Sequence, residues 1–424
     1  MFTVIRNSWA LLLGIMLLMI GNGMQGTLIG VRGELEGFST AWMSVVVSAY
    51  FAGFLLGSQV VPEMIRRVGH VRVFAALGSF ASAGLILYPA LVQEVSWTGL
   101  RFLLGFCFCG VYIVAESWLN NTTTNETRGR ALSLYMIAQM LGIVTAQGLF
   151  AVGDAAGYTL FILVSVLVSL SFAPILLSAT PVPPFETTKA MSFREIYAVS
   201  PLGCIGIFLM GGMFSALFGM SGVFGAQSGL TSGEIALFIS MIFVGGMLVQ
   251  YPIGWLSDRL DRRRLIVITA LIGFLGCVLG ATGLAGFTGL LVAAFVIGGM
   301  ANPLYSVLLA YTNDHLDYED MAAASARLLF INGLGAIGGP IVTGALMDVV
   351  GPRGFFVFIA VLMAGLASYA VWRMTQRPAI ESSDDAAQYV PVPAMAATPV
   401  TIGNLVDEWE WDETSADGVE AEAK

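Results

Sequence analysis

Two charged residues interrupt the apolar stretch at residues 98–119, where their side chains would act away from water. They are Arg101 and Glu116, and placing an ion at the middle of a bilayer costs about 2.5–3.5 kcal/mol on insertion scales. At about 100° per residue, Arg101, Gly105, Phe108, Tyr112 and Glu116 share one face of a helix. Arg101 could therefore bind an anion or take part in proton coupling. The alternative is an arginine whose side chain extends to the outer interface.

A second concentration of charge is the segment GWLSDRLDRRR at residues 254–264, between two apolar stretches. Its Asp258 could accept hydrogen bonds from a helix N-terminus or from an arginine of a neighbouring helix. The alternative is that the arginines only mark which side of a membrane the turn occupies. A glycine followed nine and ten residues later by two arginines occurs twice in the chain. The two sets are Gly57, Arg66, Arg67 and Gly254, Arg263, Arg264.

The two sets lie 197 residues apart (254 − 57 = 197), which indicates an internal repeat of about half the chain. Such repeats are common in membrane transporters. A further alignment at an offset of 193 residues pairs Gly105 with Gly298 and Tyr112 with Tyr305. The stretch at 98–119 therefore has a counterpart in the second half, although that counterpart has no residue equivalent to Arg101 or Glu116.

The composition places most of the 424 residues in a membrane. Hydrophobic residues make up 57% of the chain and charged residues 11%, whereas soluble domains carry roughly 25% charged residues. A membrane-spanning helix needs about 20 apolar residues, and twelve such stretches are present. They lie at about 9–30, 42–62, 73–92, 98–119, 131–152, 157–178, 200–223, 232–255, 265–284, 288–311, 321–347 and 354–374.

The cationic residues predict the orientation of these spans, because lysine and arginine accumulate in cytoplasmic loops. With both termini in the cytoplasm, only Arg32 and Arg353 among the loop cations face outward. The opposite orientation would reverse this ratio. We therefore expect an integral protein of a bacterial inner membrane, surrounded by lipid, with cytoplasmic N- and C-termini.

Two segments outside the spans divide the chain. Residues 179–199 contain three prolines and charges of both signs, which disfavour a membrane span and predict a cytoplasmic linker. Residues 377–424 carry eleven acids and predict a disordered acidic cytoplasmic tail. The expected domains are therefore an N-terminal six-helix bundle at 1–178 and a C-terminal six-helix bundle at 200–376.

The sequence predicts no catalytic centre, metal site or cofactor. Its two histidines fall in predicted loops, and its four cysteines lie inside apolar stretches. Cys107 and Cys109 are two residues apart and would point to different faces of a helix, so neither a disulfide nor a metal site is expected. A Walker-type phosphate loop is absent, which argues against direct use of ATP. We expect a monomer that binds no nucleic acid.

Several motifs resemble the major facilitator superfamily. The pattern G-x-x-x-D-R-x-x-x-R-R begins at Gly254, and the fourth span opens with the sequence Arg101-Phe-Leu-Leu-Gly105. The segments AESW at 115–118 and TRGRAL at 127–132 are similar to the YcaD-type branch. The resemblance covers residues 1 to about 376. It implies an all-α membrane fold of twelve helices in two pseudo-symmetric six-helix bundles, with transport by alternating access.

The resemblance also implies a substrate site, because in this family the first helix of each three-helix repeat lines a central cavity. Candidate substrate-binding residues on the first, fourth and tenth spans are Asn22, Gln25, Arg101, Tyr112, Asn302 and Tyr305. The seventh span adds Met213, Phe214 and Phe218, so we expect an aromatic and weakly polar site. The alternative for each polar residue is a hydrogen bond that only packs helices together.

A gate at the cytoplasmic ends of the bundles is the expected role of the charged turns. Candidate gating or coupling residues are Glu116, Asp258, Arg259, Arg263, Arg66 and Arg67. Glu116 is expected to pair with Arg66, Arg67 or Arg130, and a proton carrier is the alternative. In the first half, Val61 stands where the family pattern has an acid, and Glu63 could replace it, so we expect an asymmetric gate.

These features predict a secondary active transporter that moves a small organic solute and is not an enzyme. Arg101 makes an anionic solute one option, and proton coupling is another. An ion-independent facilitator stays open because few acids are buried, as does a transporter-like receptor or scaffold that presents its acidic tail. The fifth span, QMLGIVTAQGL, lacks the glycine–proline pair associated with drug antiporters, which weakens a role in efflux.

Overall fold

The computed structural model describes residues 2–121, 125–176, 191–316 and 318–376, and every regular element within these ranges is a helix. The first half contains α1 (Phe2–Leu35), α2 (Thr40–Val68), α3 (His70–Leu87), α4 (Glu94–Asn121), α5 (Asn125–Val152) and α6 (Thr159–Leu176). The second half contains α7 (Phe193–Val199), α8 (Pro201–Gly219), α9 (Ser221–Gln227), α10 (Ser232–Ser257), α11 (Arg262–Thr282), α12 (Gly286–Asn313), α13 (Tyr318–Val350) and α14 (Gly354–Met374). The predicted tail and residues 179–190 of the predicted linker lie outside the described residues.

Eleven of these helices are long and apolar enough to cross a membrane, and α6 adds a shorter apolar segment at Thr159–Pro174. This confirms the all-α membrane fold. The expected seventh span at 200–223 differs in detail, because α8 ends at Gly219 and Met220 separates it from the short helix α9. Residues of the expected linker also form a helix, α7, which begins with a capping box between Ser192 and Glu195.

Side chains that cap helix ends explain several of the boundaries. The Ser39 side chain accepts a hydrogen bond from the backbone N–H of Trp42 at the start of α2, and Thr231 forms a capping box with Glu234 at the start of α10. Gly69 stands between α2 and α3 with φ +86, a conformation that favours glycine. Short polar caps therefore separate long apolar helices.

Glycines allow the closest helix crossings, and the same crossing occurs in both halves. A β-carbon at Gly105 of α4 would lie 1.9 Å from the carbonyl oxygen of Tyr50 in α2. A β-carbon at Gly298 of α12 would lie 2.0 Å from the carbonyl oxygen of Ile242 in α10. Gly105 and Gly298 are the pair that the sequence repeat aligns. The repeat is therefore present in the packing of the helices.

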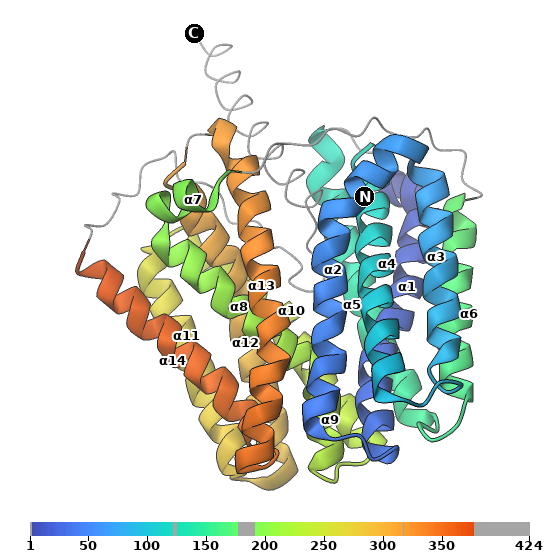
Figure 1. Ribbon diagram of the computed structural model, residues 1–424. Coiled ribbons are helices and arrows are strands. Elements are labelled where there is room, and N and C mark those ends of the chain that lie inside the picture. Colours follow the sequence, from blue (N-terminus) through green and yellow to red (C-terminus); the bar gives the residue numbers. More distant parts are fainter. Residues whose placement is uncertain (1, 122–124, 177–190, 317, 377–424) are drawn as a thin grey trace.

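The helices form two bundles that lie side by side (Figure 1). Helices α1–α6 form the N-terminal bundle, and α8 and α10–α14 form the C-terminal bundle. Between the bundles, α2 packs against α13, α5 against α10, and α9 against α1. One end of the molecule, at the top of Figure 1, carries α7, the C-terminal end of α2 and the start of α11. Arg66 and Arg67 lie in the last turn of α2, and α11 begins at Arg262. We name this end of the molecule the cationic end.

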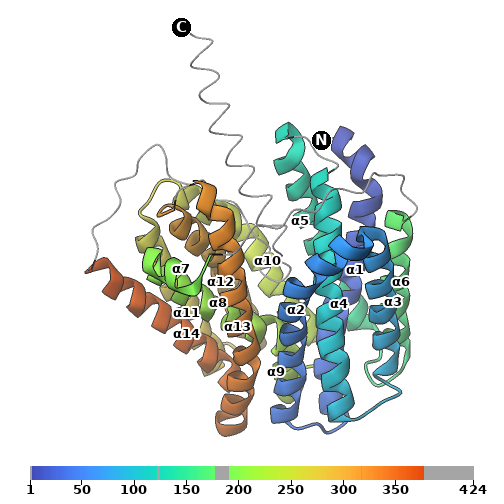
Figure 2. The same ribbon diagram turned by 45° about the horizontal axis from the view of Figure 1, so that its top comes forward.

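The two bundles are in close contact at the end opposite the cationic end. The Nε2 atom of Gln227 donates a hydrogen bond to Oγ1 of Thr40 at 2.6 Å. A β-carbon at Gly219 would lie 2.4 Å from the side chain of Val47, and one at Gly222 would lie 3.0 Å from the carbonyl oxygen of Thr27. Toward the cationic end the bundles diverge (Figure 2).

Candidate functional site

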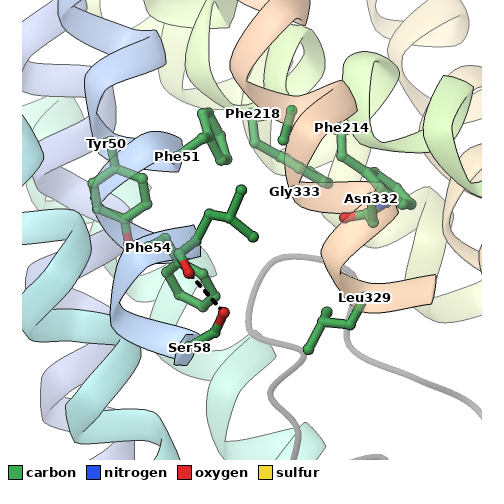
Figure 3. Close-up of a pocket in the computed structure, with 11 residues that line it drawn as sticks. Tyr50, Phe51, Phe54, Ser58, Phe214, Phe218, Leu329, Asn332 and Gly333 are labelled. Carbon is green, nitrogen blue, oxygen red and sulfur yellow. Dashed lines mark hydrogen bonds between the residues drawn. The ribbon is translucent and has the colours of Figure 1, made fainter. Parts of the chain in front are cut away.

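A pocket lies between the bundles, where α2 faces α8 and α13 (Figure 3). We name it the α2–α13 pocket. Aromatic side chains line it from both bundles, and the polar groups among its lining residues are few. The lining residues are Tyr50, Phe51, Phe54, Leu55, Ser58, Phe214, Phe218, Leu329, Asn332, Gly333 and Ala336. A flat apolar molecule would therefore contact both bundles at once.

A second pocket lies between α1, α4 and α5 of one bundle and α8, α10 and α12 of the other. We name it the α1–α10 pocket, and more of its lining residues carry amide or hydroxyl side chains. Its lining residues are Met19, Asn22, Gly23, Gly26, Thr27, Tyr112, Gln139, Met140, Ile143, Gln147, Phe218, Ile239, Phe243 and Asn302. Phe218 lines both pockets, so the aromatic and the polar regions are adjacent. The sequence-derived candidates Asn22, Tyr112 and Asn302 all line this second pocket.

A chain of hydrogen bonds connects four of the candidate binding residues inside the N-terminal bundle. The Arg101 guanidinium donates to Oε1 of Gln25 at 2.8 Å, and Nε2 of Gln25 donates to Oδ1 of Asn22 at 2.8 Å. Nδ2 of Asn22 then donates to the Tyr112 hydroxyl at 2.7 Å. Tyr50 adds a hydrogen bond from its hydroxyl to Oδ1 of Asn22 at 3.3 Å. Asn22 therefore takes part in three of these four hydrogen bonds.

Arg101 lies inside the bundle and not at its surface. The residue is 3% exposed, and its guanidinium carbon lies 4.7 Å from the centroid of the Tyr50 ring. A cation over an aromatic face is stabilised by the ring quadrupole. The side chain therefore does not extend outward, which was the alternative considered from the sequence. It also lines neither of the two pockets, and hydrogen bonds through Gln25 and Asn22 connect it to the α1–α10 pocket.

The two candidates on α12 occupy different environments. Asn302 lines the α1–α10 pocket, and its Nδ2 donates to the carbonyl oxygen of Gly298 at 3.0 Å. Tyr305 is 1% exposed and lines neither pocket. Its ring packs edge-on against Phe214, with 6.2 Å between the centroids. Tyr305 therefore supports a pocket-lining ring from behind.

Glu116 is fully buried and accepts a hydrogen bond from the hydroxyl of Tyr135 at 3.1 Å. Two of its three expected partners, Arg66 and Arg67, bind Glu63 instead, each with an N–O distance of 2.7 Å. The side chain of the third, Arg130, lies outside the described residues. Arg66 and Arg67 are both largely exposed and lie within one turn of the end of α2. In this conformation, Arg66 and Arg67 therefore form their ion pairs with Glu63 inside α2.

The charges of the second repeat are organised around Arg262, which sequence reasoning left out of the gating set. Arg262 is buried and lies 2.5 Å from Oδ1 of Asp314 and 3.8 Å from Oδ1 of Asp258. Arg263 pairs with Asp261 at 3.0 Å. Arg259 covers the Trp255 ring, with its guanidinium carbon 4.2 Å from the centroid. All of these contacts join residues of the C-terminal bundle.

Asp261 caps α11, and its carboxylate accepts from both the backbone and the side chain of Arg263. Partial burial acts to raise the pKa of Asp261, but the hydrogen bonds from Arg263 outweigh it and hold the pKa below its usual value. A carboxylate with a lowered folded-state pKa stabilises the fold above its unfolded pKa, about 3.9. That contribution is lost as the pH falls through the folded pKa.

We therefore expect Asp261→Asn to be less stable than the wild type at pH 7 by up to about 1 kcal/mol, because asparagine keeps the cap but loses the ion pair. The difference in Tm between the two proteins should shrink as the pH is lowered below about 4. The measurement is a thermal unfolding series in detergent between pH 7 and pH 3.5. A difference in Tm that does not change with pH would contradict this role of Asp261.

The model of the Major Facilitator Superfamily matches residues 11–230 and 202–405 of this chain. The chain belongs to the Major Facilitator Superfamily. It is therefore an integral membrane protein and a membrane transporter, not an enzyme. This match confirms the membership that the sequence motifs indicated.

Relatives in the superfamily match most of the chain. An uncharacterized MFS-type transporter of Yersinia enterocolitica is 26% identical over 87% of this chain and 95% of its own length. The uncharacterized MFS-type transporter YcaD of Escherichia coli is 25% identical over 85% of this chain and 94% of its own length. The resemblance to the YcaD-type branch is thus confirmed.

Solved structures share the fold at low sequence identity. The nucleoside transporter NupG has a TM-score of 0.72 at 15% identity, covering 88% of this chain and 99% of its own. A bacterial homolog of the human lysosomal transporter Spinster, in an inward-facing and unoccupied conformation, has a TM-score of 0.65 at 14% identity and covers 95% and 98%. These likenesses confirm the fold of this chain.

Sequence reasoning missed the pocket residues on α2 and α13, among them Tyr50, Phe54 and Asn332. It restricted the cavity to the first helix of each three-helix repeat, whereas α2 and α13 bring the two bundles together. A signal was present in the aromatic residues of α2, since Tyr50, Phe51 and Phe54 fall at i, i+1 and i+4. Residues at i and i+4 share a helix face.

Proposed function

We propose that this protein is a secondary active transporter of a small organic solute, which binds between the bundles and crosses the membrane as the bundles rock about it. The observation that carries this proposal is the composition of the two pockets, because each is lined by residues of both bundles. A site of this kind is divided when the bundles move relative to one another. Transport then follows from motion of whole bundles, with no chemical change in the solute.

We place the cationic end in the cytoplasm, in a bacterial inner membrane, with both termini on that side. Arginine in short loops favours the cytoplasmic side, and the cationic end carries Arg66, Arg67 and Arg262. Contact between the bundles at the opposite end then corresponds to an outwardly closed conformation. In this proposal residues 1–178 and 200–376 are the two moving bodies.

Val47 tests the motion because it is 2% exposed and lies where α2 meets Gly219 of α8. We expect Val47→Cys to react with a membrane-impermeant maleimide added outside intact cells, since the outer contacts must open during each cycle. Adding Thr40→Ala, which removes the hydrogen bond from Gln227, should increase the labelling rate several-fold. The native cysteines of the described residues are all buried.

Leu85→Cys is the matched control, because Leu85 is equally buried and lies near the same end of the molecule, but on α3 within one bundle. It should stay unlabelled in both backgrounds. If Val47→Cys is protected as fully as Leu85→Cys, with and without Thr40→Ala, the outer contacts do not open and the rocking mechanism is wrong. Labelling of Arg67→Cys from outside intact cells would contradict the proposed orientation.

A further inference from the structure

The hydrogen-bond chain that starts at Arg101 has a fixed direction. Arginine has donors and no acceptor, so Gln25 must present its Oε1 atom to Arg101. The amide nitrogen of Gln25 is then the group that donates to Oδ1 of Asn22. Asn22 in turn presents its nitrogen to the Tyr112 oxygen. One buried cation therefore sets the orientation of two amides and makes the Tyr112 oxygen an acceptor.

The hydrogen-bond chain from Arg101 ends at the wall of the α1–α10 pocket. Since the Tyr112 oxygen already accepts from Asn22, its proton is directed elsewhere, toward the Sδ atom of Met19 at 3.7 Å. A thioether is a weak acceptor. Tyr112 and Met19 both line the pocket. The Tyr112 hydroxyl is therefore a donor that a ligand oxygen can take over.

The opposite wall of this pocket is aromatic. Phe218 stacks on Phe243 with 4.9 Å between centroids and on Phe214 with 5.8 Å. Phe218 also faces the α2–α13 pocket, where Tyr50 and Phe54 extend the aromatic surface toward α2 (Figure 3). A ligand that fits both walls has a flat apolar body and one oxygen that accepts a hydrogen bond.

We propose that the α1–α10 pocket, with its aromatic wall, recognises aromatic compounds that carry a carbonyl or carboxylate oxygen. The Tyr112 hydroxyl donates to that oxygen, and Arg101 acts as a positioning residue through Gln25 and Asn22. Ligands that offer only donors at this position, such as ammonium groups, are rejected because they leave the Tyr112 proton with only the weak Met19 thioether as its acceptor. This recognition rests on the proposed transport function and specifies its class of solute.

Three probes with the same indole ring test the recognition: indole-3-acetate, indole-3-acetamide and tryptamine. We expect saturable binding of the two carbonyl compounds to the purified full-length protein, measured by isothermal titration calorimetry, and at least about tenfold weaker binding of tryptamine. Tyr112→Phe removes the donor and keeps the ring. It should weaken the two carbonyl probes about tenfold, the size of one hydrogen bond, and leave tryptamine unchanged.

Substitution of Gln25 tests the hydrogen-bond chain from Arg101 to Tyr112, because a merely structural role for Arg101 would not change ligand selectivity. In Gln25→Glu the carboxylate still accepts from Arg101 but cannot donate to Asn22. The Asn22 amide is then expected to rotate by about 180°, so that its nitrogen donates to the new carboxylate and its oxygen accepts from the Tyr112 hydroxyl. The Tyr112 proton is then no longer available to a ligand. We expect the same loss of carbonyl selectivity as in Tyr112→Phe, with Tm maintained. Arg101→Lys should keep the selectivity for the carbonyl probes, whereas Arg101→Met should lose it, since only lysine can still donate a hydrogen bond to Gln25.

Several results would overturn this recognition. They are tryptamine binding as tightly as the carbonyl probes, no saturable binding of either carbonyl probe, and carbonyl binding that is unaffected by both Tyr112→Phe and Gln25→Glu. The maleimide labelling of Val47→Cys needs no ligand. If labelling shows the motion while the probes fail, only the recognition is wrong. If labelling also fails, the transport mechanism itself is at fault.

Discussion

Gly105→Ala is expected to lower the stability of the protein by about 3 kcal/mol or more, although it adds a single methyl group. The new β-carbon would lie 1.9 Å from the Tyr50 carbonyl oxygen, so α2 and α4 must separate. Overpacking of a core costs about 1–3 kcal/mol and more where backbone must move. The measurement is the Tm and the folded yield in detergent. Gly298→Ala should have a similar effect, because its β-carbon would lie 2.0 Å from the Ile242 carbonyl oxygen.

Gly99→Ala is the matched control on the same helix. Nothing lies within 4 Å of a β-carbon at Gly99, and alanine favours a helix over glycine by up to about 1 kcal/mol. This variant should be as stable as the wild type or slightly more stable. A Gly105→Ala protein with the Tm of Gly99→Ala would show that the crossing of α2 and α4 is looser than described.

Arg262→Gln is expected to destabilise the C-terminal bundle by about 3 kcal/mol, because it removes the buried cation that pairs with the mostly buried carboxylate of Asp314. The Arg262 side chain is 6% exposed and that of Asp314 is 16% exposed, with 2.5 Å between them. Asp258 loses the same partner. Tm and urea resistance in detergent are the measurements. The double variant Arg262→Gln/Asp314→Asn should recover part of the loss, since it also removes the carboxylate charge that Arg262 balances.

Arg67→Gln is the corresponding control at the first repeat. The Arg67 side chain is 73% exposed and pairs with Glu63 at 2.7 Å, and exposed pairs contribute about 0–1 kcal/mol. A small effect is therefore expected. Equal destabilisation by Arg67→Gln and Arg262→Gln would contradict the asymmetry between the two charged turns.

The amino-acid sequence predicts the helices and their repeat well, because both follow from local patterns. Apolar stretches of about 20 residues predict spans, and the offset between Gly105 and Gly298 anticipates equivalent helix crossings. The break after Gly219 is harder to predict, since α8 and α9 form one continuous apolar stretch in the sequence. After the break, α9 packs against α1, and contacts between segments so distant in sequence leave no local pattern.

The candidate site is predictable only in part, and the reason is geometric. Asn22, Tyr112 and Asn302 lie on faces that a helical repeat can assign, and they line the α1–α10 pocket. The contribution of Tyr50 and Asn332 depends on how α2 meets α13 across the bundles, which no local pattern specifies.

The charged turn illustrates the same limit at the scale of single residues. Arg262, Arg263 and Arg264 are adjacent, and the sequence does not distinguish them. The cap at Asp261 sets where α11 begins, and that start decides which arginine faces Asp314. Which of the three is buried is therefore a property of the helix boundary.

The glycine crossings also constrain how this sequence can diverge under mutation. Every single-base change that alters a glycine codon introduces a residue with a β-carbon, or a stop codon. At Gly53, Gly105, Gly245 and Gly298, that carbon would lie within 2.1 Å of a carbonyl oxygen on the neighbouring helix. Selection for folded protein in a mutant library should therefore remove nearly all variants at these four codons, while variants at Gly99 persist. At these crossings, the only single-base changes that the packing tolerates are synonymous ones.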